Sequence, residues 1–184
     1  MSDNVTFHRY DSNAAAPHVD DLVALYLDVY ATADSAFFNE DRYRRQLTGH
    51  MTAPRWEAVT ATNGPTMIGY IYGFVLPADT RWWGGLRTLV PDGYTTEDGQ
   101  RTVAISEILV RAAWRRHGIA SALHREFLAD RAEQRATLLV EPDNQPAQLA
   151  YRRWGWTKDA QLLPSWPRAP LYDVLTLDLG SPTP

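Results

Sequence analysis

The sequence predicts one domain of the mixed α/β class, in which helices cover both faces of a mostly antiparallel sheet. Two kinds of segment alternate along the chain. Some have the alternating or β-branched pattern of strands, and in the others the apolar residues recur at helical spacing. The chain has 184 residues, of which 45% are hydrophobic, and this suits a single core. We therefore expect one domain over residues 1–184.

The first part of the chain predicts one strand and two helices. The expected elements are a strand over residues 5–10, a break at residues 11–13, a helix from His18 or Asp20 to about Tyr30, and a more charged helix over residues 40–49. In the second helix Tyr43 and Leu47 share one face. Residues 31–39 are too few and too mixed to form another core helix.

A hairpin and a long connection follow. Strands over residues 56–61 and 66–76 flank Asn63 and Gly64, a pair typical of a tight hairpin turn. Gly69 and Gly73 interrupt the second strand, where glycines often mark a bulge or the close approach of a neighbour. The connection over residues 77–100 is long and rich in aromatic residues, which favours a functional segment.

The central strand and helix lie within residues 102–128. The strand ends at Val110, and the helix begins after Gly118, with Ile119, Leu123 and Phe127 on one face. The remaining elements are a strand over residues 137–140, a helix with Pro146 in its first turn, and strands over residues 156–160 and 171–179.

The turn between the central strand and its helix contains Arg115, Arg116 and His117 in front of Gly118. First-turn N–H groups of a helix have no intrahelical partners, so a pyrophosphate would bind well there. Neither GxGxxG nor a P-loop sequence is present, although a nucleotide-binding protein of another kind stays an alternative. Without an anion, the same residues are a solvated basic turn that caps a helix, and the nearby Arg111 is most simply solvated charge.

The segment VRAAWRRHGIA resembles the pantetheine and pyrophosphate signature of the GCN5-related N-acetyltransferases (GNAT), VxPxxRxxGxG/A. Val110, Arg115, Gly118 and Ala120 match it, whereas Ala112 stands where proline is common. The resemblance implies acetyl-CoA as donor and a GNAT-like sheet that splays in a V between the central strand and the next. The donor-binding residues that it implies are Ile108, Leu109, Val110, Arg115, Arg116, His117, Gly118, Ile119, Ala120, Ser121, Asn144, Ala147 and Tyr151.

A second segment, EPDNQPAQLAYRRWGW, is also similar to the family. The matching residues are Asn144, Ala147, Tyr151, Gly155 and Trp156. The resemblance implies that Tyr151 protonates the departing thiolate. The alternative is a core phenol whose hydroxyl has a hydrogen-bond partner.

Glu107 is the candidate general base, because it interrupts an otherwise apolar strand. A primary ammonium must lose a proton before its nitrogen attacks a thioester, and a partly buried carboxylate has a pKa raised toward a useful value. In several family members a glutamate in the matching position relays this proton. The alternative is an exposed carboxylate or one paired with an arginine. The oxyanion would accept a hydrogen bond from a backbone N–H group near Ile108 to Val110.

Composition excludes some chemistry. There is no cysteine, so we expect direct transfer without a cysteinyl intermediate. The net charge of −4 argues against a nucleic-acid partner. His117 and His124 without a third ligand are a poor metal site, and we expect no metal and His124 on the helix surface. The sequence has no signal-peptide pattern and no apolar stretch of membrane-spanning length, which predicts a cytoplasmic protein without a membrane partner.

The acceptor is expected to be a small cationic or aromatic amine, of antibiotic, polyamine or amino-acid type. In this fold the acceptor side is built from three connections, and here these contain Asp34, Phe37, Phe38, Trp82, Trp83, Tyr94 and Trp166. A protein N-terminus or lysine is the rival acceptor. A non-catalytic acyl-CoA sensor is the alternative from another class, and it would need neither Glu107 nor Tyr151. Because many relatives are dimers, a homodimer is also an expectation.

Overall fold

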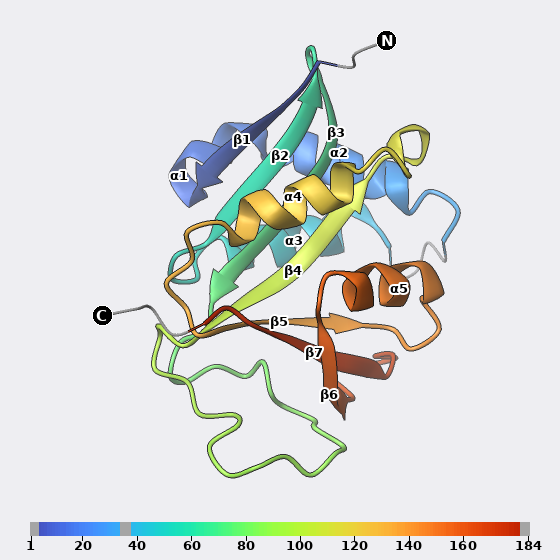
Figure 1. Cartoon of the computed structure of the whole chain (residues 1–184). Coiled ribbons are helices and arrows are strands. Elements are labelled where there is room, and N and C mark those ends of the chain that lie inside the picture. Colours follow the sequence, from blue (N-terminus) through green and yellow to red (C-terminus); the bar gives the residue numbers. More distant parts are fainter. Residues whose placement is uncertain (1–3, 34–37, 181–184) are drawn as a thin grey trace. The chain divides into compact units, whose positions relative to one another are not determined.

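The computed structural model describes residues 4–33 and 38–180, and within them seven strands form a mixed sheet (Figure 1). The chain forms two compact units. The first comprises residues 1–74 and 105–130, and the second comprises residues 75–104 and 131–184. The central strand, β4 (Thr102–Val110), begins in the second unit and ends in the first.

The sheet of the first unit contains β1 (Val5–Asp11), β2 (Glu57–Asn63) and β3 (Thr66–Val75), followed by β4. The β1–β2 and β2–β3 pairs are antiparallel. Arg111 N–H, just beyond β4, donates to the Ile68 carbonyl over 2.9 Å. This bond ties the end of β4 to β3.

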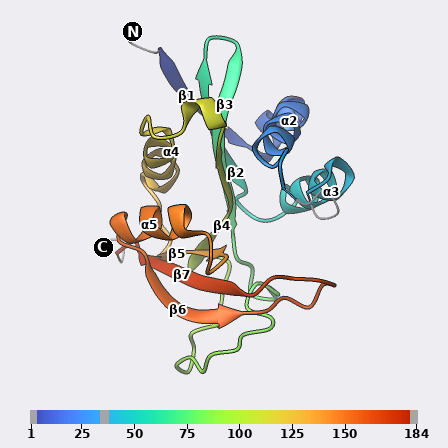
Figure 2. The ribbon, with the colours of Figure 1, turned by 90° about the vertical axis from the view of Figure 1, so that its right-hand side faces the viewer.

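Three longer helices cover the two faces of these strands (Figure 2). They are α2 (Val19–Val29) and α3 (Glu40–His50) on one face, and α4 (Ile119–Leu128) on the other. Each helix buries a stripe of apolar residues at helical spacing, because only one face of each helix meets the sheet. In α2 these residues include Leu22, Leu25 and Tyr26.

The second unit contains β5 (Arg135–Val140), β6 (Thr157–Leu162), β7 (Tyr172–Asp178) and α5 (Gln145–Arg153). The strand β7 lies between β5 and β6 and is antiparallel to both. Residues 85–88 of the long connection lie along the free edge of β6. Leu86 bridges Leu162, and Arg87 N–H donates to the Gln161 carbonyl over 2.8 Å.

The predicted α/β class with a mixed sheet is confirmed, and the strand over residues 102–110 is found with the predicted ends. The predicted break of the first strand at residues 11–13 is confirmed, because β1 ends at Asp11. Asp11 accepts from Ala14 N–H and caps a short helix, α1 (Ser12–Ala15), which was not predicted and which continues into a 3₁₀ turn, η1 (Ala16–His18). The single-domain assignment and the V-shaped splay stay predictions.

Strand ends differ from the expected ones by one or two residues. The strand β5 begins at Arg135 and not at residue 137, because Arg135 pairs with Asp178 of β7. A short 3₁₀ turn, η2 (Ala112–Trp114), opens the basic turn after β4. The predicted close approach at Gly69 is confirmed, since a Cβ there would lie 2.8 Å from the Leu109 carbonyl oxygen.

Candidate active site

Glu107 lies at the middle of β4, in the first unit. Its carboxyl is surrounded by protein, although part of the residue remains in contact with solvent. Desolvation raises the pKa of Glu107 from its ordinary value of 4.5 to about 8, and the Arg42 guanidinium opposes this rise. Close to neutral pH the carboxyl can therefore both hold and accept a proton.

Three buried tyrosines lie near this carboxyl, and none of them is among the predicted site residues. Tyr70 and Tyr72 come from β3 and Tyr43 from α3, and all three are fully buried. Burial and the nearby Glu107 carboxylate raise the pKa of each phenol, so the hydroxyls stay protonated. Tyrosines two residues apart in a strand share a face, and this spacing is a signal that the sequence did contain.

The end of β4 is held by Arg111, which the sequence analysis treated as solvated charge. Its Nη1 lies 2.8 Å from Asp28 Oδ2 of α2, and its Nε donates to the Met67 carbonyl over 2.8 Å. This correction has a simple cause: sequence spacing could not show that α2 and β3 meet beyond Val110. The contacts fix the place where β4 gives way to the basic turn.

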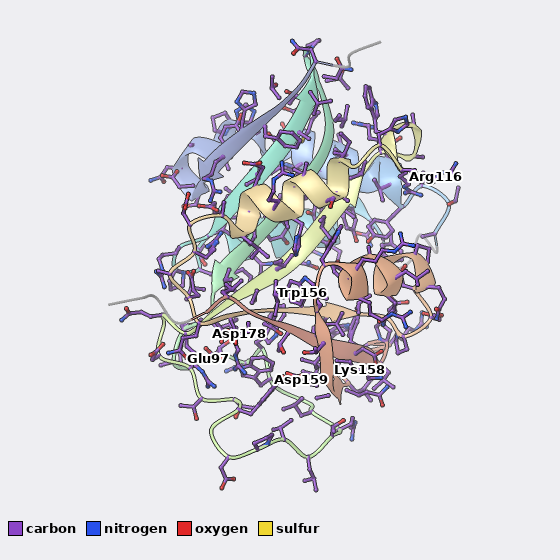
Figure 3. The ribbon with its side chains drawn as sticks, in the orientation of Figure 1. Glu97, Arg116, Trp156, Lys158, Asp159 and Asp178 are labelled. Atoms are coloured by element: carbon purple, nitrogen blue, oxygen red, sulfur yellow. The ribbon has the colours of Figure 1, made fainter. Side chains whose placement is uncertain are left out.

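The basic turn leads into α4 with its backbone N–H groups open. Arg116 and Gly118 both have left-handed backbone conformations, with φ values of 64° and 79°. Gly118 is the N-cap residue of α4, no side chain caps the helix, and its first turn contains no acidic residue. Figure 3 shows Arg116 in this turn. The side chains of residues 115–117 are exposed.

The other described α-helices begin differently. Asp11, Asn39 and Asn144 cap α1, α3 and α5 with their side chains, and α2 has Asp20 and Asp21 in its first turn. Among the α-helices in the described part of the chain, only α4 has neither a side-chain cap nor an acidic residue in its first turn. Its N-terminal partial charge is thus left for an external anion. A Cβ at Gly118 would meet nothing within 4 Å, so the approach is open.

A cavity of about 350 Å³ adjoins this turn. Val5 and Phe7 of β1 line one side, and Trp114, Gly118 and Ile119 line the other. The wall is mostly apolar and lies beside the open helix terminus. His124, predicted on the helix surface, is instead 8% exposed, and desolvation lowers its pKa to about 4. It faces inward because it follows the buried Leu123 and precedes Phe127 on the packed side of α4.

In the second unit, α5 carries Asn144, Ala147 and Tyr151. Asn144 accepts from Ala147 N–H over 3.3 Å and so caps the helix. Tyr151 is 8% exposed, and its ring packs edge-on against Trp154 and Trp156. Glu107 and the basic turn belong to the first unit, whereas α5 belongs to the second.

Asp173 of β7 ties α5 to the sheet of the second unit, and no local pattern in the sequence predicts this role. The residue is 5% exposed. Its carboxylate accepts from Gln148 Nε2 and Gln161 Nε2, each over 3.1 Å, and lies 2.6 Å from Lys158 Nζ. Gln148 is one turn before Tyr151, so these bonds hold the helix segment that carries the phenol.

The long connection is ordered around Arg135. The guanidinium carbon lies 5.1 Å from the centre of the Trp83 ring and 4.7 Å from that of Tyr94. Glu97, also on the connection (Figure 3), accepts from Arg135 Nη2 over 3.0 Å and from Trp83 Nε1 over 3.1 Å. The rings of Trp83 and Tyr94 are thus already in contact with a cation of the same chain, the Arg135 guanidinium.

The other candidate acceptor residues differ in exposure. Trp166 is 43% exposed, and Trp82 is half-buried. Phe38 stacks on Tyr30 with ring centres 4.3 Å apart. Asp34 and Phe37 lie outside the described residues. Contact with an acceptor stays a prediction for all seven.

None of the helices in residues 4–33 and 38–180 is long and apolar enough to cross a bilayer. In the same ranges, no three His, Cys, Asp or Glu side chains come together in a way that could hold a metal ion.

The chain is similar to known acetyltransferases in sequence and in fold. The sequence model of the acetyltransferase (GNAT) family matches residues 20–156. No curated protein sequence matches the chain. Among solved structures, the ribosomal-protein-S18-alanine N-acetyltransferase from Escherichia coli superposes with a TM-score of 0.67 at 11% identity, over 97% of this chain and 96% of that one.

Two further structures share the fold. PH1933 from Pyrococcus horikoshii has a TM-score of 0.66 at 14% identity, over 95% of this chain and 98% of that one. The PaiA N-acetyltransferase from Thermoplasma acidophilum, solved in complex with coenzyme A, has a TM-score of 0.62 at 10% identity, over 97% and 99% of the two chains. At these identities the structural likeness concerns the fold alone.

Proposed function

The chain belongs to the GNAT family of acetyltransferases, and from this premise we propose that it transfers the acetyl group of acetyl-CoA directly to a small primary amine. The observation that carries the proposal is the Glu107 carboxyl, buried at the middle of β4 with a pKa of about 8. Such a group accepts a proton at a pH where most carboxylates are too weak as bases.

The residues of the basic turn fit the pyrophosphate of the donor. The N-terminus of α4 has no side-chain cap, Gly118 leaves open space, and three exposed basic side chains precede it. Backbone N–H groups of residues 118–121 would bind the phosphate oxygens, with Arg115 and Arg116 adding charge-assisted hydrogen bonds. The bound donor supplies a thioester, whose leaving group is a thiolate.

Glu107 would prepare the acceptor. An alkylammonium has a pKa of about 10.4, so its nitrogen has no free lone pair at neutral pH. The Glu107 carboxylate takes the proton, directly or through a water molecule, and the nitrogen then attacks the acetyl carbon. Backbone N–H groups near Ile108 to Val110 would stabilise the charge that develops on the acetyl oxygen.

Tyr151 would return a proton to the leaving thiolate. The side chain is nearly buried, and its ring packs against Trp154 and Trp156, which hold the phenol in one orientation. The role is part of this proposal, and it follows from the family resemblance of the segment over residues 144–156.

For the acceptor we propose a small molecule with an amine and an aromatic or apolar part. Because Arg135 occupies the ring faces between Trp83 and Tyr94, the exposed Trp166 and the half-buried Trp82 and Phe38 are the better candidates for contact. A protein N-terminus is the second candidate, since one structure of the same fold is an alanine N-acetyltransferase of a ribosomal protein. A cytoplasmic location stays a prediction.

The proposal is tested by calorimetric titration with acetyl-CoA, followed by thiol release against a panel of primary amines and of peptides with free N-termini. We expect binding, and thiol release with small amines. Release with peptides alone would assign the second candidate. Binding without release from any acceptor, together with unchanged affinity in Glu107→Gln, would favour the non-catalytic sensor instead.

A further inference from the structure

A closed triangle of hydrogen-bonding groups lies in the core of the first unit. The Tyr72 hydroxyl is 3.1 Å from His50 Nδ1 and 3.1 Å from Ser106 Oγ. The third side, from Ser106 Oγ to His50 Nδ1, measures 3.2 Å. Any proton that reaches one of the three atoms is therefore within hydrogen-bond distance of the other two.

The triangle continues into a longer chain of hydroxyl groups. Tyr43 lies close enough to Tyr72 to affect the pKa of that phenol, and the Tyr43 hydroxyl lies 2.5 Å from that of Tyr70. These three phenols are fully buried. Phenylalanine would fill the same volume without the cost of desolvating a hydroxyl, so a connected polar chain here calls for a function or a structural reason.

One end of the chain lies beside the proposed base. Ser106 precedes Glu107 in β4, and the Glu107 carboxylate is close enough to raise the pKa of Tyr72 electrostatically. The other end is His50, the last residue of α3, which is half-buried and so reaches the surface. The chain thus runs from the base toward solvent at the end of a helix.

We propose that Tyr72, Ser106 and His50 form a relay that carries the proton taken up by Glu107 out to solvent. The inference rests on the proposed function, in which Glu107 takes a proton from the acceptor amine in each turnover. In the ternary complex, the acceptor and the acetyl group fill the open side of the carboxyl. The carboxylate must be restored before the next acceptor reacts, and the relay gives the proton a separate exit.

Glu107 passes its proton, directly or through one water molecule, to the Tyr72 oxygen. The Tyr72 proton moves to His50 Nδ1 while the Ser106 hydroxyl donates to the Tyr72 oxygen, and His50 releases its Nε2 proton to water. The carboxyl becomes a carboxylate, one proton enters solvent, and Tyr72, Ser106 and His50 each end neutral. Rotation of the hydroxyls and return of the imidazole to its first tautomer reset the relay.

His50 has the protonation state that this role needs. Desolvation lowers its pKa to about 4, so the imidazole is neutral at physiological pH. A neutral imidazole has one nitrogen that accepts and one that donates, whereas the charged form only donates. Its described neighbours are the Tyr72 hydroxyl, the Ser106 hydroxyl and the ring of Phe74, whose centre is 4.9 Å away.

The test compares Tyr72→Phe with Tyr70→Phe. The two changes remove the same atom from equally buried tyrosines on one face of β3, but in the described residues only the Tyr72 hydroxyl contacts His50 and Ser106. We expect Tyr72→Phe to lower kcat by about tenfold to 100-fold, with an unchanged KM for acetyl-CoA and a larger solvent deuterium isotope effect. Tyr70→Phe leaves the triangle intact and should lower kcat much less than Tyr72→Phe does.

His50→Ala should show the same loss, and added imidazole should restore part of kcat. Equal losses in Tyr70→Phe and Tyr72→Phe without a change in the isotope effect would overturn the relay in favour of a packing role. Wild-type kcat in both Tyr72→Phe and His50→Ala would also overturn it, while thiol release by the wild type would leave the proposed function standing.

A measurement without an acceptor separates the two proposals further. When Glu107 ionises near pH 8, the imidazole ¹⁵N shifts of His50 should respond in the wild type and in Tyr70→Phe, but much less in Tyr72→Phe. Imidazole ¹⁵N shifts of His50 that do not change when Glu107 ionises in the wild type would overturn the relay. If thiol release failed with every amine, this response would still decide whether the two groups are coupled.

Discussion

Arg135 Nη2 donates a hydrogen bond of 3.0 Å to Glu97 Oε1, and the exposed fractions of the two side chains are 13% and 0%. Glu97 Oε2 is buried and has no partner among the described residues. Replacing Arg135 by methionine would leave this carboxylate without a compensating charge. We expect Arg135→Met to lower the free energy of unfolding by about 3–5 kcal/mol, measured by urea denaturation.

Two controls sharpen this prediction. Arg44→Met removes an arginine that is ion-paired with Asp20 and Glu40 at the surface, and it should change stability little. Adding Glu97→Gln to Arg135→Met should recover part of the loss, because the buried group is then neutral. Equal effects of Arg44→Met and Arg135→Met would contradict the assignment of Arg135 as the organising cation.

The rate of transfer should depend on the ionisation of Glu107. Its pKa of about 8 predicts that kcat/KM for the acceptor rises with pH through a midpoint near 8, as the carboxylate forms. In Glu107→Gln this rise should disappear, and kcat/KM should fall by about 100-fold or more. Glu126→Gln, a change at the surface of α4, is the control and should keep the wild-type profile.

The same residue should make the free energy of unfolding fall as the pH rises, whereas it makes the rate of transfer rise. The pKa of Glu107 is about 8 in the folded chain and near 4.5 in an unfolded one, so the unfolded state ionises first. The stabilising contribution is complete below pH 4.5 and is lost as the pH rises through about 8. Glu107→Gln should remove a fall on the order of a few kcal/mol over this window, measured by urea denaturation at several pH values.

Tyr151→Phe tests the proposed acid. The variant keeps the ring that packs against Trp154 and Trp156, so the melting temperature should hardly change. Loss of the hydroxyl should lower kcat by about tenfold to 100-fold and leave the dissociation constant for acetyl-CoA unchanged. Tyr172→Phe in β7 is the matched control. Full activity in Tyr151→Phe would make Tyr151 a packing residue.

Gly118→Ala tests the anion site. A non-glycine residue at a φ of 79° is strained by about 1 kcal/mol, and a side chain would enter the space left for phosphate. We expect the affinity for coenzyme A to fall by about tenfold or more, measured by calorimetry. Gly99→Ala bears the same strain at a φ of 83°, and a Cβ at either glycine would meet nothing within 4 Å. It should keep the affinity, so equal affinities of the two variants would remove the turn from the site.

Local patterns predicted most of the elements. Hydrophobic spacing indicated β4, α2 and α3 to within a residue or two, since strand and helix periods depend on near neighbours in the chain. The same spacing placed Glu107 within an apolar strand. The basic turn was predicted because two arginines, a histidine and a glycine in front of an apolar helix are consecutive in sequence.

Contacts between distant segments could not be predicted in this way. Sequence alone placed Trp83 and Tyr94 as candidates for binding an acceptor, whereas Arg135 lies against both rings from a strand more than forty residues after Tyr94. The Tyr72, Ser106 and His50 triangle joins three elements, and no local spacing predicts such a meeting. His124 was misplaced because one helix face cannot be assigned from a single polar residue.

The pairing of residues 85–88 with β6 also bears on the solubility of the protein. β6 ends the strand order of the described sheet, and an uncovered edge strand offers free N–H and C=O groups to the edge of another molecule. Leu86 and Arg87 occupy part of that edge within the same chain. A version shortened in this connection would therefore be prone to aggregate through β6, even if its active site were intact.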